Sequence, residues 1–506
     1  MRPDDIDWLS SELKQLARDL EHGGATANPP LVIAIDQGGH ATRAVAFDLT
    51  GRQVADAYVS VTTMRDGSDR VEQDADEVAG SVAAVLEDLA QSLGPQSTRV
   101  AACGLATQRS SIVCWDRLSG AALSPVISWQ DRRNAEWLAT LRPQADRIRA
   151  LTGLVLSPHY GASKLRWCLE ELPAVAAARR RGRLAIGPLA SFLAHRLVPQ
   201  RPALVDPANA SRTQLWDPAT RDWSPELLEI FGIPAECLPT SVPSRADYGP
   251  VRFGACEVPL LVCTGDQCAA AFALGWPQVG TVTFNVGTGG FLLRPLDAAP
   301  PDATSLLRSV LWADERRVLY ALEGTINGAG SALDWLAGQI GLDAHRAANA
   351  LDRRRVTDLD VPLFVNAVGG LGSPYWIAAA QPGFVGGGDE LAQVAAVIES
   401  IAFLARTNLD AMRAITAAPR QIEITGGLAQ SEYLCQSLAD VTHLPVERLS
   451  IKEATAAGLA FLTALEPALW RPDAEGKRYE PAPDAALLER YVRWQNVMQK
   501  LVPMHR

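Results

Sequence analysis

A strand, a glycine turn and a second strand follow one another twice in this chain. The first copy is "AIDQGGHATRAVAFD" at residues 34–48, and the second is "QVGTVTFNVGTGGFLLRP" at residues 278–295. Each copy continues with a further strand ("QVADAYVSV" and "RVLYALEG"), then helical sequence, then a buried strand ("RVAACGLAT" and "RQIEITGGLA"). Apolar runs bounded by glycine are typical of strands. The repeated order predicts an α/β protein with two duplicated domains and a central cleft.

The length of 506 residues agrees with more than one hydrophobic core. We expect domains at 31–276 and 277–470, followed by a tail at 471–506 that ends in a helix. Residues 1–30 form an extension, in which leucines and an isoleucine at steps of three and four predict a short amphipathic helix before a linker. This helix is either a strut packed on the body or an oligomer contact.

Composition excludes several classes of function. The net charge of −10 and the pI near 5.3 argue against a nucleic-acid partner. No apolar run is long enough to span a membrane, and the acidic N-terminus lacks the apolar segment of a signal peptide. The eight cysteines form no CxxC pair, so neither a zinc site nor a disulfide framework is expected. Reduced, buried cysteines predict a cytoplasmic protein.

The two glycine turns are candidate phosphate sites. Backbone N–H groups of a turn without bulky side chains can converge on an anion, which suits Gly38–Gly39 and the turn at 287–290. One such turn alone is weak evidence because hairpins commonly contain glycine, but matching turns in a duplicated fold are stronger. No G-x-x-x-x-G-K-[ST] or G-x-G-x-x-G motif is present, which disfavours the P-loop and dinucleotide-binding folds.

Two carboxylates stand at strand ends. Asp36 lies at the mouth of the first turn, where it could hold Mg²⁺ through water. Asp266 follows the apolar strand "VPLLVCTG", at the strand end where α/β proteins place reacting groups. A carboxylate there can take the proton of a hydroxyl that attacks a γ-phosphate. The structural alternative is that Asp266 only caps the helix that follows it.

Ordered motifs extend the argument along nearly the whole chain. They include "AIDQGGHATRAVAFD", "VEQDADEV", "LATQRSSIVCWDRLSG", "SPHYGASKLRW", "TGDQCAA", "FNVGTGGFLL", "YALEGTINGAGSALDWL", "GGLGSPYW", "TGGLAQSEYLCQSLAD" and "KEATAAGLAFL". In this order they resemble the FGGY family of carbohydrate kinases, within the actin–hexokinase–heat-shock ATPase superfamily, and are most similar to its glycerol kinases. The resemblance implies two RNase-H-like domains closing over ATP, Mg²⁺ and a small polyol or sugar.

The resemblance also implies roles for individual residues. Asp266 would be the catalytic base, and Asp36 would attend the metal. The substrate would be bound by Arg109, Ser110, Trp129, His159, Asp266 and Gln267. The phosphates and the adenosine would be bound by Asp36, Gly38, Gly39, His40, Arg43, Gly287, Thr288, Gly330, Asp334, Gly426, Gly427 and Ser431.

The chain departs from glycerol kinases at the substrate and phosphate sites. Gly39 and His40 replace two threonines, which removes two hydroxyl donors; His40 either supplies an imidazole N–H instead or points to solvent. Ser110 replaces a glutamate and His159 a tyrosine, both of which bond glycerol in that family. Tyr160 is then either a compensating contact or a core aromatic residue. Asp334 stands where the family often has a glutamine.

These observations favour an ATP-dependent kinase of glycerol or another small polyol. The alternatives are a kinase of a ketose or longer sugar alcohol, and a catalytically weakened member that senses nucleotide or sugar. After "SPYW" the chain lacks the acid and the arginine that glycerol kinases have there, so the subunit contacts of that family are not carried over to this chain. A homodimer is the possible assembly. An actin-like polymer has no support in the sequence.

Overall fold

The computed structural model describes residues 29–501 except for short gaps at 68, 302–304, 316, 353–355, 357–358, 452, 465–468 and 472–474. The predicted N-terminal helix therefore lies outside the described residues. The chain divides into two compact units. Unit 1 takes in the described residues of Met1–Pro277, Ser309–Leu319 and Lys452–Asp473, and unit 2 those of Gln278–Arg308, Tyr320–Ile451 and Ala474–Arg506. No helix among the described residues is long and apolar enough to cross a membrane.

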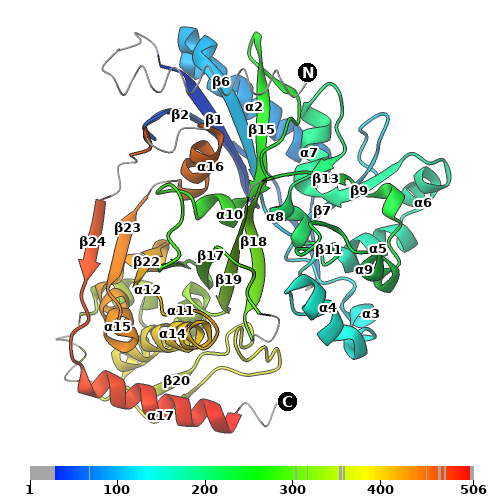
Figure 1. Ribbon diagram of the computed structural model, residues 1–506. Helices are drawn as coiled ribbons and strands as arrows, with labels where there is room; N and C mark the ends of the chain where they lie inside the picture. The colour runs from blue at the N-terminus through cyan, green and yellow to red at the C-terminus, as the bar shows by residue number, and fades with distance from the viewer. Residues whose placement is uncertain are drawn as a thin grey trace. The chain divides into compact units, whose positions relative to one another are not determined.

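A six-stranded sheet forms the centre of unit 1 (Figure 1). Its strands lie in the order β14 (Pro250–Phe253), β15 (Cys256–Gly265), β6 (Val100–Thr107), β1 (Leu31–Gln37), β2 (Ala41–Asp48) and β3 (Gln53–Ser60). β1, β2 and β3 form an antiparallel meander, while β6 runs parallel to β1 and β15 parallel to β6. The three consecutive strands predicted after the linker are confirmed.

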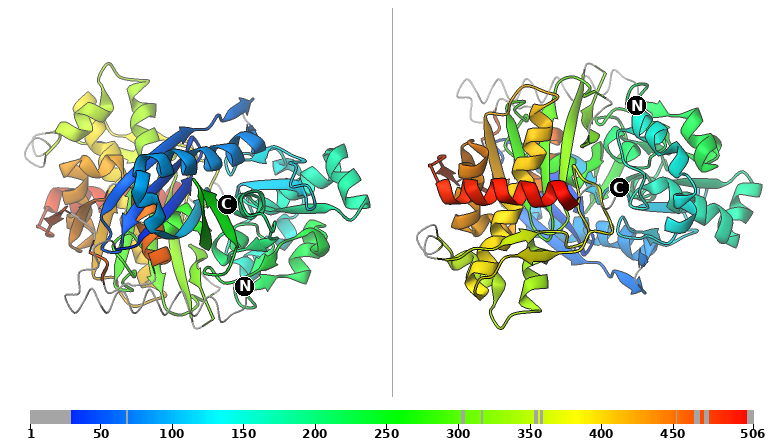
Figure 2. Two further views of the ribbon diagram at one scale, coloured as in Figure 1. Left: turned by 90° about the horizontal axis from the view of Figure 1, so that it is seen from above. Right: turned by 90° about the horizontal axis from the view of Figure 1, so that it is seen from below.

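Helix α2 (Ala75–Leu93) packs against β2 and β3 on one face of this sheet (Figure 2). The carboxylate of Asp74 accepts hydrogen bonds from the N–H groups of Asp76 and Glu77, which explains why "QDADEV" begins a helix. Gly94 ends the helix with φ of 53°. Helix α16 (Ala454–Ala464), from near the end of the chain, packs against β1 and β6.

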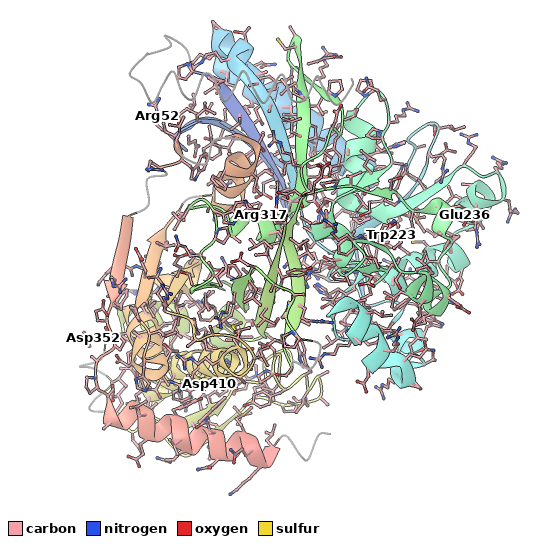
Figure 3. The ribbon with its side chains drawn as sticks, in the orientation of Figure 1. Arg52, Trp223, Glu236, Arg317, Asp352 and Asp410 are labelled. Carbon is pink, nitrogen blue, oxygen red and sulfur yellow. The ribbon has the colours of Figure 1, made fainter. Side chains whose placement is uncertain are left out.

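A second sheet with surrounding helices completes unit 1. Its strands lie in the order β4 (Met64–Asp66), β5 (Arg70–Gln73), β8 (Val126–Ile127), β7 (Ile112–Asp116) and β9 (Leu184–Pro188). Two short pairs join β10 (Leu204–Val205) to β13 (Thr240–Ser241) and β11 (Trp216–Asp217) to β12 (Asp222–Trp223). The helices are α3 (Ala135–Ala139), α4 (Ala145–Thr152), α5 (Gly161–Glu171), α6 (Pro173–Arg180), α7 (Leu189–Leu197), α8 (Pro207–Ser211), α9 (Pro225–Phe231) and α10 (Asp266–Ala270). Figure 3 labels Trp223 and Glu236 in this part.

A seven-stranded sheet repeats the plan of the six-stranded sheet of unit 1. Its strands lie in the order β18 (Leu307–Ala313), β19 (Val318–Ile326), β17 (Gly290–Leu296), β16 (Thr281–Val286), β22 (Gln421–Thr425), β23 (Val446–Ser450) and β24 (Glu475–Tyr479). β16, β17 and β19 form the meander, β22 and β23 continue in parallel, and β24 is an antiparallel edge. The matching strand orders confirm the predicted duplicated α/β fold.

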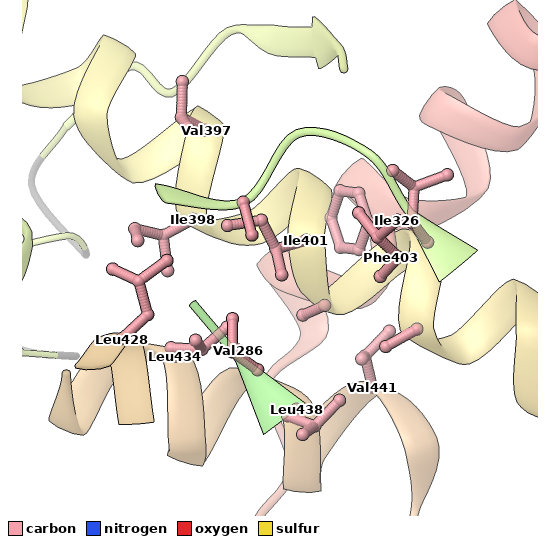
Figure 4. Packing of buried hydrophobic residues seen from close by; sticks show 14 of the residues in the cluster. Val286, Ile326, Val397, Ile398, Ile401, Phe403, Leu428, Leu434, Leu438 and Val441 are labelled. Atoms are coloured by element: carbon pink, nitrogen blue, oxygen red, sulfur yellow. The ribbon is translucent and has the colours of Figure 1, made fainter. Parts of the chain in front are cut away.

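The core of unit 2 lies between this sheet and long apolar helices. Figure 4 shows Ile398 and Ile401 of α14 (Glu390–Arg413) beside Leu434 of α15 (Glu432–Thr442) and Val286 at the end of β16. The remaining elements are α11 (Gly330–Ala337), α12 (Ala344–Ala350), β20 (Leu363–Val365), β21 (Gly383–Val385) and α17 (Ala485–Leu501). α17 packs on β20, where the indole of Trp494 donates to the Phe364 carbonyl (3.0 Å). The predicted C-terminal helix is thereby confirmed.

Unit 1 depends on a close approach between α16 and α10. A Cβ added to Gly458 would overlap the carbonyl oxygen of Ala269, a backbone atom that cannot rotate away. We predict that Gly458→Ala lowers the free energy of unfolding by about 2–3 kcal/mol because the two helices must separate. Gly80, exposed on α2 with open space at its Cβ position, is the matched control: Gly80→Ala should stabilise by about 0.5–1 kcal/mol. Urea unfolding of both variants checks this, and equal effects would contradict it.

Candidate functional site

The first glycine turn connects β1 to β2. The N–H of Gly38 donates to the Ala41 carbonyl (2.9 Å) and closes the turn. A Cβ added to Gly39 would meet no atom within 4 Å, so packing does not explain this glycine. His40 is exposed. The N–H groups of Gly39 and His40 donate to no other group in the part of the chain that the structure describes. The turn thus presents backbone donors on an open surface.

Asp36 stands at the end of β1, beside other charged groups. Its pKa is raised to about 7 by burial and by the negative charges of Asp266 and Glu453, while Arg43 acts in the opposite direction. Arg43 is opposite Asp36 in the β1–β2 register and forms an ion pair with Glu453, which directly precedes α16. Two other carboxylates therefore act on Asp36 at this end of the sheet.

Arg109 joins the segment after β6 to the start of α10. Its Nη2 donates to Oε1 of Gln267, its Nε lies 4.0 Å from Oδ1 of Asp266, and its Nη1 lies 3.6 Å from Sγ of Cys268. The Arg109 side chain is 8% exposed. A Cβ on Gly265 would overlap Cγ and Cδ of Arg109, so the strand end must be glycine for the arginine to reach Asp266.

Lys164 ties together two further predicted site residues. Its Nζ donates to the carbonyl oxygens of Ser110 (3.1 Å) and His159 (2.7 Å) from α5. Lys164 is 1% exposed, and burial lowers its pKa to about 7. Ser110 adopts a left-handed backbone conformation (φ 65°), and its buried hydroxyl has no hydrogen-bond partner among the described residues. A polar ligand atom could satisfy this hydroxyl.

Aromatic residues border the same region. The ring of His159 lies 5.6 Å from that of Trp129 and 5.0 Å from that of Tyr160, in an edge-on arrangement. The backbone N–H of Trp129 donates to the hydroxyl of Ser111 (3.1 Å). Trp129 is 36% exposed, whereas Tyr160 is buried in the core. The packing therefore favours the core role for Tyr160 over the compensating contact.

In unit 2 the second glycine turn packs against the start of α11. The carbonyl oxygen of Gly287 accepts from the N–H of Gly330 (2.9 Å), and that of Thr288 accepts from the N–H of Ala329 (3.1 Å). A Cβ on Gly330 would lie 2.8 Å from the Gly287 oxygen. Gly426, with φ of 97°, lies against the backbone of β16. Four predicted nucleotide residues are thus neighbours.

Three other predicted nucleotide residues have varied surroundings. A Cβ on Gly427 would meet nothing within 4 Å. Asp334 is exposed, and its Oδ1 lies 2.7 Å from Nε2 of His345, at hydrogen-bond distance. Ser431 is fully buried: its hydroxyl caps α15 and donates to the Ala348 carbonyl (3.0 Å). The structure gives Ser431 a structural role that sequence reasoning had not included.

The structure gathers the predicted residues into two groups. Unit 1 holds Asp36, Gly38, Gly39, His40, Arg43, Arg109, Ser110, Trp129, His159, Asp266 and Gln267, and unit 2 holds Gly287, Thr288, Gly330, Asp334, Gly426, Gly427 and Ser431. No cluster of three or more histidine, cysteine, aspartate or glutamate side chains suited to a metal occurs in the described part of the chain.

Sequence reasoning missed five residues that shape the unit 1 site. They are Lys164, Glu453, Gln37, Gln73 and Gln108, which are buried or partly buried beside predicted site residues. A charged residue among the buried positions of "ASKLRWC" was a usable signal for Lys164. Nothing in the sequence shows that the glutamines meet, because they come from three separate segments.

Lys164 predicts a pH dependence of stability. Its pKa falls from 10.5 to about 7 on folding, chiefly through burial, with Asp131 raising it and Arg133 lowering it further. Between these values the unfolded chain binds a proton that the folded protein lacks, so the free energy of unfolding rises with pH, by at most about 1.4 kcal/mol per pH unit. We expect the advantage of wild type over Lys164→Met in urea unfolding to grow from about pH 7 to about pH 9. Arg166→Met, on the same helix, should show no such trend.

The chain matches two family models over most of its length. Residues 31–273 match the N-terminal domain, and residues 282–466 the C-terminal domain, of the FGGY family of carbohydrate kinases. The glycerol kinase of Ectopseudomonas mendocina is 34% identical over 492 residues, which cover 93% of this chain and 98% of that protein. Glycerol kinase 1 of Pseudomonas aeruginosa is 33% identical over 451 residues, covering 87% and 91%.

Solved structures share the fold at lower identity. Glycerol kinase of Plasmodium falciparum with ADP superposes with a TM-score of 0.84 at 22% identity and covers 94% of this chain and 98% of that one. Xylulose kinase of Rhodospirillum rubrum gives 0.81 at 23%, covering 94% and 100%. The fold is therefore the two-domain actin-like fold. This chain belongs to the FGGY family of carbohydrate kinases, which transfer a phosphoryl group from ATP to an alcohol group of a polyol or sugar.

Proposed function

We propose that the unit 1 residues around Arg109 and Asp266 form the acceptor site and that Asp266 is its general base. The observation that carries this is the contact of one buried guanidinium, that of Arg109, with both Asp266 and Gln267. Arg109 can orient an acceptor hydroxyl beside the carboxylate, which removes the hydroxyl proton as the oxygen attacks phosphorus. Ser110, Trp129 and His159 supply the remaining walls.

The acceptor we propose is glycerol or another small polyol. Relatives named glycerol kinases cover nearly the whole chain, and the partly exposed side chain of Trp129 offers apolar surface to the carbon chain of an acceptor. The unpaired hydroxyl of Ser110 can bond one substrate oxygen. A ketose or longer sugar alcohol is the second candidate, because serine is short and leaves more room at this position than the glutamate of glycerol kinases.

For the nucleotide we propose two phosphate turns. Gly38, Gly39 and His40 would present N–H groups from unit 1, as would Gly287 and Thr288 from unit 2. Gly427, with open space at its Cβ position, would border the adenosine beside the second turn, where Gly330 and Gly426 let the backbone segments pack closely. Asp334 of α11 and Ser431, which caps α15, would support this region, and Arg43 would act at the first turn. A cytoplasmic location and a homodimer remain predictions.

Mg²⁺ fits the charges around Asp36. Repulsion from Asp266 and Glu453 helps to raise the Asp36 pKa, and a divalent cation would relieve that repulsion. Mg²⁺ commonly binds one or two carboxylates and fills its other positions with water and phosphate oxygens, so no larger ligand cluster is required. Asp36 would hold the ion, which when bound neutralises charge on the transferred phosphoryl group.

The test of the base is ADP release across a panel of polyols and sugars, with glycerol included. We predict turnover on a small polyol and a loss of at least about 100-fold in kcat for Asp266→Asn, because the amide cannot accept the proton. Asp247→Asn, at an exposed carboxylate that only caps a loop, is the control and should keep wild-type turnover. A ketose as the best substrate would favour the second candidate.

If no compound of the panel causes ADP release while calorimetry shows that ATP still binds, the protein would instead be a nucleotide sensor. Full activity of Asp266→Asn would remove Asp266 from the role of base.

Gly265 offers a second test, aimed at Arg109. An added methyl group at Gly265 must displace the arginine side chain through its Cγ and Cδ. We predict that Gly265→Ala raises the KM for the acceptor about tenfold or more and leaves the KM for ATP nearly unchanged. Gly80→Ala again serves as the control. An equal rise in both KM values would show that the arginine does not act on the acceptor alone.

A further inference from the structure

Three buried glutamines meet between the first phosphate turn and the acceptor residues. Gln37 ends β1, Gln73 ends β5, and Gln108 follows β6; they are 0%, 1% and 3% exposed. Nε2 of Gln108 donates to Oε1 of Gln73 (2.7 Å) and Oε1 of Gln37 (3.2 Å). A buried amide without hydrogen-bond partners is destabilising, so a cluster of three is retained only where its hydrogen bonds are made.

One side of this cluster holds the carbonyl groups of the phosphate turn. The Gly38 oxygen accepts from Nε2 of Gln37 (2.7 Å). The Gly39 oxygen accepts from Nε2 of Gln73 (2.9 Å) and from the hydroxyl of Thr63 (2.6 Å). In a trans peptide the C=O and the next N–H point in opposite directions. With both carbonyl groups turned toward the glutamines, the following N–H groups are turned outward, away from the cluster.

The other side of the cluster holds the acceptor segment. Oε1 of Gln108 accepts from the hydroxyl of Ser111 (3.0 Å), which itself accepts from the N–H of Trp129 (3.1 Å). The backbone N–H of Gln108 donates to the Gln37 carbonyl (2.9 Å). Arg109 and Ser110 lie between Gln108 and Ser111 and are therefore anchored at both ends.

The orientation of the Gln108 amide is fixed by its partners. Its Nε2 faces the oxygens of Gln73, Gln37 and Gly38, whereas its Oε1 faces a hydroxyl donor. Rotation by half a turn would place Oε1 against three acceptors, which no proton could bridge. Gln108 thus connects the phosphate turn to the acceptor segment in only one orientation of its amide.

We propose that Gln37, Gln73 and Gln108, which we name the glutamine clamp, position the phosphate turn and the acceptor segment in one frame. This inference rests on the proposed function of those two regions. The clamp residues act through their neighbours, so they are positioning residues. Loss of the Ser111 hydrogen bond should weaken acceptor binding alone, and loss of the hydrogen bonds of Thr63 and Gln73 should weaken nucleotide binding alone. Loss of the Gln108 amide should weaken both.

Three variants separate these effects. Ser111→Ala should raise the KM for the best acceptor about tenfold and change the KM for ATP less than twofold. Thr63→Val combined with Gln73→Met should do the reverse, and Gln108→Met should raise both and lower kcat. Thr442→Val is the control, because it removes a buried hydroxyl that donates to the Leu438 carbonyl (2.6 Å) within α15 of unit 2. It should change neither KM.

Hydrogen exchange gives a readout that does not need turnover. In the full chain without substrate, Ser111→Ala should speed exchange at the Trp129 amide and at 108–113, and the Thr63–Gln73 double variant at 36–42. Gln108→Met should speed exchange at both segments, with melting curves showing that each variant is folded. If Gln108→Met fails to fold, the other two variants still decide.

The outcomes separate the clamp from the proposed function. The expected exchange pattern in a protein that turns over no substrate would keep the clamp and reject the proposed acceptor chemistry. Active variants whose KM values and exchange rates match wild type would overturn the clamp. The same holds if every variant raises both KM values in proportion to its loss of melting temperature, since the glutamines would then be merely structural.

Discussion

The planarity of the peptide bond constrains both glycine turns of this kinase. A turn can offer N–H groups to a phosphate only if its carbonyl groups are held on the opposite side. Unit 1 holds them with side-chain amides and a hydroxyl, whereas unit 2 holds the carbonyl groups of Gly287 and Thr288 with backbone N–H groups at the start of α11. Two sheets of the same plan have reached the same turn orientation with different donors.

The unit 1 site is made of polar groups in an apolar setting. Lys164 and the glutamine clamp are buried, and each is satisfied by carbonyl oxygens of neighbouring segments. Such groups contribute little net stability, but they permit few alternative packings because every other arrangement leaves a donor or acceptor without a partner. Arg109 and Ser110, which we propose to bind the acceptor, are positioned by this arrangement. These buried polar residues therefore make the site rigid while adding little to the free energy of unfolding.

Sequence patterns predicted the frame better than the site. Periodic apolar runs and glycine turns sufficed to predict the strands, the C-terminal helix and the duplication, because these depend on local residues. Asp266 alone could not be told from a helix cap, and its role came from the family resemblance. Lys164 and Glu453 were missed because their importance lies in contacts between distant segments. Ser431 shows the opposite limit: a residue in a matching motif can serve packing.

The position of α16 has a consequence for synthesis of the chain. Gly458 fits against α10, and Gly104 of β6 against Leu459 and Thr463, so the first sheet is covered by a helix from near the end of the sequence. The ribosome will therefore have synthesised most of unit 2 before α16 emerges and the core of unit 1 can form. Until then the nascent N-terminal half keeps one apolar face of its sheet uncovered, so we expect a fragment ending near Pro277 to be prone to aggregation.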